Sequence, residues 1–526
     1  MGKKMVFLLA LLMAGTVQFA IAGGGSDNTA SSSSGIVEIE FFNMNQAWTV
    51  PNWGVDAVTA RITERTGIRM KPGAPQGDWQ QIANLWLASR DYPEMMHMSS
   101  TNVVFNQYIE AGALHAINRL ADQYNYPKIM SEYIYPTTRR YWTKPDGNMY
   151  LAPSWFSDDG FGSVGEALNV RNDLYKQFGE PRINSMSDLY QYMIRIRDAN
   201  LTASDGSKLW AFSFGSTDNQ YIAKIANAWG SKIVRFNYID EASRSIRFFL
   251  RNPTVTSALQ WLGRALREGL MDPDTLTFDS TSRSAAYSNH KYGVIFDWFW
   301  NMWSANALGM RQNPDMWYKA IPVPAGTPGV QPFHGRYHVT GTSGTMVTRN
   351  AKNPAAAIKF LDFMLSPEGQ ILNFYGIEGP MGRGTMYYDA NRQPWLHPEA
   401  YSAYVADTTG YRAVHGIRIW DFQVNAKYNW ERTQEDPQRQ ANRLVAQQSA
   451  FEGSLQEIIV IDALTPEGML LAEIQSTINS QLIRILQEPN DQQIAQAVQN
   501  LLAEYERRGV GRLEEAWTRM YREIAR

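Results

Sequence analysis

Cysteine is absent from this chain of 526 residues. That absence excludes disulfide bonds, thiolate catalysis and metal sites ligated by cysteine. The chain also lacks an excess of charge of one sign. It has 49 Lys and Arg residues and 51 Asp and Glu residues, which give a formal net charge of −2. This balance gives no electrostatic reason to expect binding to nucleic acid or to an anionic membrane. We expect no metal and no cofactor.

Long hydrophobic runs are missing after the first residues of the chain. Residues 5–14 form an apolar stretch that follows Lys3 and Lys4 and precedes the small residues around Ala22. The stretch is shorter than the roughly 20 residues that span a bilayer, so residues 1–22 are predicted to be a signal peptide. Residues 23–35 are rich in Gly and Ser and are predicted to be a flexible tether. The tether resembles a lipoprotein spacer without the lipid-accepting cysteine, so a free periplasmic protein is expected.

The remaining sequence predicts a soluble α/β protein. Its length, with 44% hydrophobic and 19% charged residues, is too great for a single core and predicts two or more lobes. Residues 36–42 alternate as a half-buried strand does, Asp56 can cap a helix that ends before Gly67, and residues 68–70 return as a second strand. The chain therefore opens with a β-α-β unit.

Aromatic residues are concentrated between residues 293 and 303. An apolar run suited to a buried strand passes directly into Trp298, Trp300 and Trp303, with Asp297 and Asn301 among them. Indole rings beside a carboxylate and an amide suit the rim of a cleft, and a sugar is one ligand that such a surface fits. Core packing is the alternative for any single ring. Three tryptophans within six positions cannot all point into one core, so we expect the run to line a cleft.

Catalytic and metal motifs are scarce. His334 and His338 lie four residues apart without an HExxH pattern, and no GxSxG or Walker A sequence occurs in a strand-to-helix setting. Asp158 and Asp159 are adjacent, so they cannot flank one glycosidic bond. Residues 198–207 keep the alternating oxygens of a calcium loop but have too few carboxylates, which predicts a structural turn.

Several segments carry patterns that a known family shares. Residues 87–94, LASRDYPE, resemble its ASGDLPDV segment, and residues 145–153, PDGNMYLAP, resemble its PDGKiYaiP hairpin. Residues 170–174, VRNDL, resemble its strand-to-helix entry, and residues 353–369 resemble its knPeaalkflDfl.s.eG pattern. Together and in this order they resemble the extracellular solute-binding proteins of ABC importers. The sugar-binding family 1 is most similar, including its large oligosaccharide subgroup with alginate-binding periplasmic proteins.

The resemblance implies an α/β, two-lobed periplasmic-binding-protein fold of type II-like topology, with hinge crossings and an extended helical C-terminal region. Residues 36–165 and 335–400 would form lobe I. Residues 166–334 and 401–526 would form lobe II. A chain that crosses more than once between two lobes can close on a ligand by hinge bending, so the cleft between them is the expected site.

The implied function is capture of a carbohydrate, most simply an oligosaccharide, and its delivery to an ABC transporter permease by a monomer without enzymatic activity. A secreted carbohydrate-active enzyme and a binding protein for another solute, such as a peptide, are the alternatives. Trp298 is the first expected ligand contact, because the family places a tryptophan from a matching strand end in the cleft. The expected contacts, chosen otherwise by loop position and aromaticity, are Asn45, Trp48, Trp155, Phe214, Asp218, Asp297, Trp298, Trp300, Trp420 and Asp421.

Overall fold

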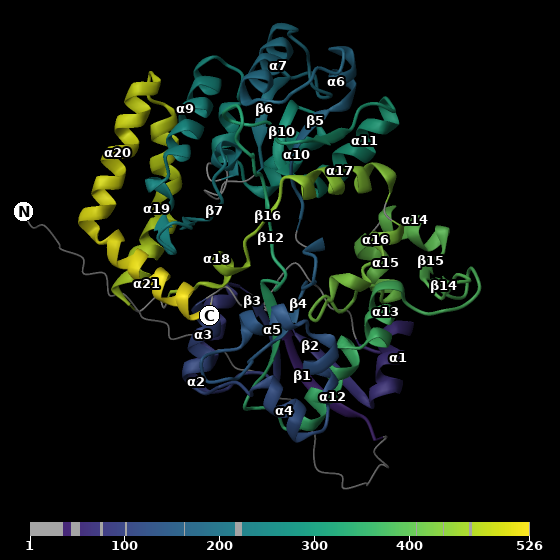
Figure 1. Ribbon diagram of the computed structural model, residues 1–526. Helices are drawn as coiled ribbons and strands as arrows, with labels where there is room; N and C mark the ends of the chain where they lie inside the picture. The colour runs from purple at the N-terminus through teal and green to yellow at the C-terminus, as the bar shows by residue number, and fades with distance from the viewer. Residues whose placement is uncertain are drawn as a thin grey trace, which may run out of the picture. The chain divides into compact units, whose positions relative to one another are not determined.

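The helices and strands of the protein are drawn in Figure 1, which shows a computed structural model. The residues that the structure describes are 35–43, 53–73, 77–99, 103–161, 164–215, 224–406, 408–434, 436–461 and 465–524. Within these residues, two separate β-sheets form the framework on which the rest of the chain packs. No helix in the described ranges is both long enough and apolar enough to cross a membrane.

The first sheet has five strands in the order β2-β1-β3-β13-β4. Strands β2 and β3 run parallel to β1, whereas β13 is antiparallel to both β3 and β4. The bounds of these strands are Val37–Asn43 for β1, Ile68–Gly73 for β2, Met95–Ser99 for β3, Ala152–Ser154 for β4 and Ser343–Val347 for β13. Since β13 comes late in the sequence, the chain returns to this sheet after it has formed the second one.

The β-α-β opening of the first sheet is confirmed. Helix α1, Ala57–Thr66, begins where the Asp56 carboxylate accepts a hydrogen bond from the backbone N–H of Thr59. It ends at Gly67, whose φ of 70° is the left-handed conformation that glycine adopts without steric cost. The other helices associated with this sheet are α2 Trp79–Ser89, α3 Val103–Glu110, α4 Ile117–Gln123, α5 Pro136–Trp142, α12 Pro354–Leu365 and α13 Pro367–Tyr375.

The second sheet has four strands in the order β11-β5-β10-β6. Strand β10, Tyr292–Trp298, lies between β6, Trp210–Phe214, which is parallel to it, and β5, Glu166–Arg171, which is antiparallel. Strand β11, Tyr318–Ile321, pairs antiparallel with β5. All six residues of β5 and the first six of β10 are buried, which confirms the buried strand predicted at residues 294–296.

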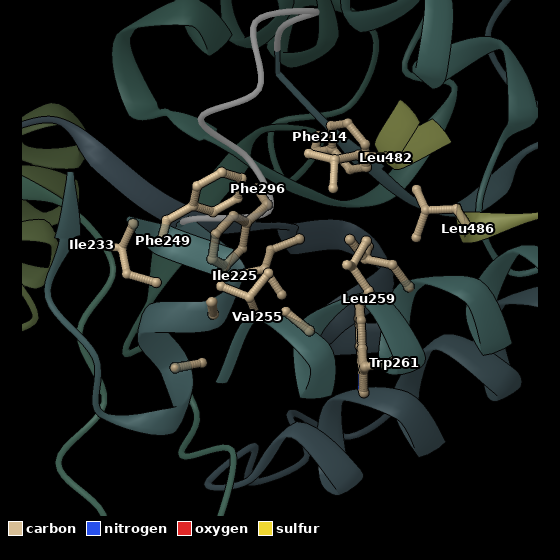
Figure 2. Packing of buried hydrophobic residues seen from close by; sticks show 14 of the residues in the cluster. Phe214, Ile225, Ile233, Phe249, Val255, Leu259, Trp261, Phe296, Leu482 and Leu486 are labelled. Atoms are coloured by element: carbon tan, nitrogen blue, oxygen red, sulfur yellow. The ribbon is translucent and has the colours of Figure 1, made fainter. Parts of the chain in front are cut away.

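The hydrophobic core beside the second sheet includes the C-terminal helices. Figure 2 shows Phe214 with Leu482 and Phe296 with Ile225 and Val255, all members of one cluster of buried residues. The helices that form this region are α9 Pro253–Arg267, α19 Pro466–Leu486, α20 Asp491–Arg508 and α21 Val510–Ile524. Helix α9 packs on both α19 and α20, so the extended helical C-terminal region is confirmed as part of the core.

The other helices and strands lie around these two cores. Helices α6 Asn172–Gln177, α7 Met186–Asp198, α10 Ser280–Ser288 and α11 Trp303–Gln312 accompany the second sheet. The later helices are α14 Pro398–Ala406, α15 Thr408–His415, α16 Glu431–Gln434, α17 Pro437–Gln448 and α18 Ser454–Ile458. Short strands pair as β7 Ile233–Val234, β8 Asn237–Asp240 and β9 Ser245–Phe248, as β12 Arg336–Tyr337 with β16 Phe451–Glu452, and as β14 Met386–Tyr388 with β15 Pro394–Leu396.

The chain after residue 401 differs from the expected division into lobes. Ile419, Trp420 and Phe422 belong to the core of the first sheet, although residues 401–526 were expected with the second lobe. Further on, Asn442 of α17 bonds to β11 of the second sheet, where it accepts from the N–H of Ala320. This segment therefore contacts both sheets in turn. The other expected lobe boundaries remain predictions.

Candidate ligand-binding cavity

A cavity of about 1010 Å³ is lined by chain segments that leave both sheets. Trp155 follows β4 of the first sheet, whereas Trp300 and Trp303 follow β10 of the second. Among the described residues, the lining consists of Trp155, Trp300, Trp303, Ser304, Ala307, Leu308, Arg311, Tyr401, Ser402, Tyr404, Arg412, Arg418, Asn429, Trp430, Glu431, Arg439 and Arg443. Concave sites of this size, with aromatic walls and a few convergent polar groups, are typical of small-molecule binding.

The tryptophans after β10 form a packed pair at one wall. The rings of Trp298 and Trp300 have centroids 4.5 Å apart and an interplanar angle of 30°. A Cβ atom at Gly165 would overlap both indole rings, so only glycine leaves room for this pair. Trp300 lines the cavity and Trp298 packs against its ring, so the pair forms a platform on which the face of another ring can stack.

Substitution of Gly165 tests this platform. We expect Gly165→Ala to displace Trp300, since the new methyl group overlaps its ring, and to lower the free energy of unfolding by about 1–3 kcal/mol. Urea denaturation measures that cost. Gly511→Ala is the matched control, because a Cβ at Gly511 in α21 meets open space. Equal denaturation midpoints for the two variants would contradict the tight fit at Gly165.

Asp297, the residue before Trp298, accepts hydrogen bonds that hold the turn after β10. Its carboxylate accepts hydrogen bonds from the hydroxyl of Tyr287 at 3.0 Å, from the amide of Asn301 at 3.0 Å and from the backbone N–H of Trp298 at 2.7 Å. Burial raises the pKa of Asp297, and the Asn301 hydrogen bond acts in the opposite direction. With 3% of its surface exposed, Asp297 shapes the turn after β10 and is not among the residues that line the cavity.

Another part of the cavity wall is a network of arginines and carboxylates. Arg418 lies 3.4 Å from Asp421 and 3.5 Å from Glu431, and Arg443 lies 3.0 Å from Glu431. Burial lowers the pKa of Arg418, but Asp421, Tyr404 and Glu431 outweigh this effect and raise it overall. The guanidinium of Arg418 is therefore a permanent charge in the cavity wall.

Trp155 and Arg418 meet within this wall. The guanidinium carbon of Arg418 lies 4.9 Å from the ring centre of Trp155, a favourable cation–π distance. Both residues have left-handed backbone, with φ of 56° and 52°. Such a conformation is uncommon for residues other than glycine and costs on the order of 1–3 kcal/mol at each position. Strain of this kind is concentrated at functional sites, which agrees with a binding role for this wall.

The structure brings some of the expected contacts together and corrects others. Trp155 and Trp300 line the cavity, and Trp298 packs against Trp300. Phe214 is 6% exposed in the core of the second sheet, because the side chains of β6 are covered by helices. Trp420 is fully buried in the core of the first sheet. Both are therefore core residues in this structure.

The other expected contacts have different outcomes. Asp421 supports Arg418 from below, and its side chain is 4% exposed. Asn45, Trp48 and Asp218 lie outside the described residues. The expected turn at residues 198–207 is present, where Asp205 accepts hydrogen bonds from the backbone and the hydroxyl of Ser207.

Sequence reasoning missed most of the wall between residues 401 and 443. The missed lining residues include Tyr401, Tyr404, Trp430 and Arg439. The available signal was the interleaving of Tyr and Trp with Arg along this stretch, which is unusual for a solvent-exposed helical segment. Trp303 was part of the expected aromatic run and also lines the cavity.

Two sheets connected by repeated chain crossings, with an aromatic cavity lined from both, define a solute-binding protein. Residues 56–371 match the model of the bacterial extracellular solute-binding protein family, and the chain belongs to this family. Membership in a family of extracellular proteins agrees with export of the chain.

Known relatives share this assignment. The fructooligosaccharide ABC transporter substrate-binding protein FusA of Streptococcus pneumoniae serotype 4 is 23% identical over 405 residues, which cover 72% of this chain and 71% of FusA. The crystal structure of the alginate-binding protein AlgQ2 without calcium ion has a TM-score of 0.70 and 19% identity, covering 92% of this chain and 97% of AlgQ2. FusA in complex with kestose has a TM-score of 0.71 and 18% identity, covering 93% and 99%. These structural likenesses show that the chain has the two-lobed fold of solute-binding proteins.

Proposed function

We propose that the protein captures a carbohydrate, most simply an oligosaccharide, in this cavity and delivers it to the permease of an ABC importer. The observation that carries the proposal is the convergence of Trp155, Trp300, Trp303 and Trp430 on one cavity. Indole faces stack on the C–H faces of sugars, while hydroxyl groups find partners in the polar side chains between them. The name of FusA, a fructooligosaccharide-binding relative, supports the same solute class.

The proposal includes the location and state of the protein. A signal peptide at residues 1–22 and the tether at residues 23–35 fit a free periplasmic protein, since the lipid-accepting cysteine is missing from the sequence. A carrier that must present its closed form to a permease is expected to act as a monomer. The distribution of cavity-lining residues over both sheets favours closure by hinge bending.

Binding without turnover is part of this proposal. Glycoside hydrolysis uses two carboxyl groups about 5–9 Å apart around the scissile bond. Glu431 is the one carboxylate among the described lining residues, and it is held in ion pairs with Arg418 and Arg443. This arrangement favours a binding protein over a secreted carbohydrate-active enzyme. Chromatography of the glycans after incubation tests the point, since cleavage products would overturn it.

Trp300→Ala tests the location of the site. We expect the variant to bind oligosaccharide about 10–100-fold more weakly, because removal of a central aromatic contact costs about 1.4–2.8 kcal/mol of binding free energy. The measurement is tryptophan fluorescence of the mature chain during titration with neutral and acidic oligosaccharides and with peptides. Trp86→Ala is the matched control, a half-buried tryptophan of α2 that packs on Phe42. Equal affinity losses in both variants would place the ligand elsewhere.

A further inference from the structure

Three buried charged residues that do not line the cavity lie close to the platform of Trp298 and Trp300. Lys224 lies 2.8 Å from a carboxylate oxygen of Glu166, the first residue of β5, and Arg336 of β12 lies 3.4 Å from the same oxygen. The side chain of Glu166 is 2% exposed and that of Lys224 is 9% exposed. Glu166, Lys224 and Arg336 thus form a charged cluster that is nearly shielded from water.

The charged cluster contacts the platform through Lys224 and through β5. The ammonium nitrogen of Lys224 lies 5.5 Å from the ring centre of Trp298, within the range of a cation–π contact. Glu166 is the residue opposite Trp298 in the register of β5 and β10. The residue before it, Gly165, leaves the space that both indole rings occupy. Contacts with Lys224 and with the start of β5 therefore fix the position of Trp298, and Trp300 packs against that ring.

The charged cluster is also held by a strand outside the two large sheets. A Cβ atom at Gly335 would lie 2.8 Å from the Cβ of Glu166, so the backbone at this glycine packs directly on Glu166. The next residue, Arg336, pairs with Phe451 where β12 meets β16. In the sequence, β12 follows β11 of the second sheet and precedes β13 of the first. Glu166 is therefore packed between the platform and a segment in which the chain passes from one sheet to the other.

Stability alone does not explain this burial of charge. Removal of charges from water is costly, and a buried ion pair is often no more stable than apolar side chains of the same volume. A buried pair can instead select one arrangement of its surroundings, because a displaced charge loses its partner. Since Lys224 contacts the ring that packs against Trp300, the orientation of the platform is the arrangement that this pair can select.

We propose that Lys224 and Glu166 are positioning residues for carbohydrate binding, which hold Trp298 in the orientation that lets Trp300 present its face to the cavity. This inference rests on the proposed function and adds residues that act on the solute only through the platform. The charge of Lys224 holds the ring of Trp298, and Glu166 holds Lys224. Without Lys224, the rings gain freedom that a bound sugar must remove, which lowers its affinity.

Lys224→Met removes the charge and keeps most of the side-chain volume. We expect the variant to bind oligosaccharide about tenfold more weakly, because binding must then order the platform. Calorimetric titration of the mature protein with kestose, maltotriose and cellotriose measures the change. Glu166→Gln keeps the shape of its side chain, and a loss of affinity in the same direction is expected because Lys224 is held less firmly.

Arg171→Met is the matched control for Lys224→Met. Arg171 lies at the other end of β5, where it forms a buried ion pair with Asp173 at 2.8 Å. We expect Arg171→Met to lower the urea midpoint and to leave the affinity unchanged. Equal losses of affinity in the two variants would show a general effect of buried charge and overturn the positioning role.

A double variant tests whether Lys224 acts through the platform. In a protein that already carries Trp300→Ala, Lys224→Met is expected to weaken binding by less than about twofold, since two residues that act through one contact have non-additive effects. A loss of about tenfold in that background would show that Lys224 acts on the solute by another route, and would overturn the proposal.

Circular dichroism of the platform gives a measurement that needs no ligand. Indole rings 4.5 Å apart couple their electronic transitions, and the coupling depends on the angle between them. Trp298→Phe identifies the coupled band by its loss. We expect Lys224→Met to reduce this band and Arg171→Met to leave it unchanged.

The outcomes distinguish this inference from the proposed function. An unchanged band and unchanged affinity in Lys224→Met would overturn the positioning role and leave carbohydrate binding standing. A reduced band in the variant, with no saturable heat from any sugar in the unaltered protein, would overturn the proposed function and leave the placement of Trp298 by Lys224 standing.

Discussion

Trp420→Ala is expected to lower the free energy of unfolding by about 3–5 kcal/mol, the range for removal of a large aromatic side chain from a core. Trp420 is 0% exposed. Its ring centroid lies 4.5 Å from that of Phe41, 4.8 Å from that of Phe422 and 4.9 Å from that of Phe360. No neighbouring side chain can fill the space of an indole without disturbing these contacts, so most of the cavity persists.

Urea denaturation of the variant measures this cost. Ligand titration is carried out separately without urea, where the variant is folded. Trp86→Ala serves again as the control, and we expect a smaller loss because its half-buried ring has one aromatic neighbour, Phe42. An unchanged unfolding midpoint together with lost ligand affinity would show that Trp420 contacts ligand and that the core position is wrong. The same experiment therefore decides whether Trp420 is a core residue or a ligand contact.

The case of Trp420 shows what a single sequence can and cannot predict. Local patterns predicted the β-α-β opening and the buried strand β10, because each depends on periodicity and on capping residues nearby in sequence. Burial of Trp420 depends on Phe41 and Phe360, which come from distant parts of the chain. Aromatic residues suit a core and a sugar site equally well, so composition alone cannot separate the two.

The sequence also predicted only part of the candidate site. The aromatic run after β10 predicted Trp298 and Trp300, because a buried strand that passes into several tryptophans leaves some of them at its edge. The network of arginines was not predicted, since it depends on contacts between distant residues: Glu431 pairs with both Arg418 and Arg443, and Asp421 pairs with Arg418. In the sequence alone, these charged residues look like those of any helical segment and do not indicate a network.

The second large effect on stability is expected for Asp421→Asn, in the network of ion pairs that Asp421 and Glu431 form with Arg418 and Arg443. The substitution keeps the shape of the side chain but removes a carboxylate from a network in which Arg418 is 11% exposed and Asp421 is 4% exposed. Removal of one partner from a buried ion pair costs about 3–5 kcal/mol when the other charge is left alone, and we expect a cost near the lower end because Glu431 still pairs with Arg418. Urea denaturation gives the value. Asp159→Asn, which breaks the more exposed pair with Arg432, is the matched control and is expected to cost about 0–1 kcal/mol.

Combining Asp421→Asn with Arg418→Met separates lost charge balance from lost packing. The double variant is expected to be more stable than the sum of the two single effects by at least about 1 kcal/mol, because it removes both members of the pair. If the two effects on the free energy of unfolding are additive, the interaction between Arg418 and Asp421 makes no net contribution to stability.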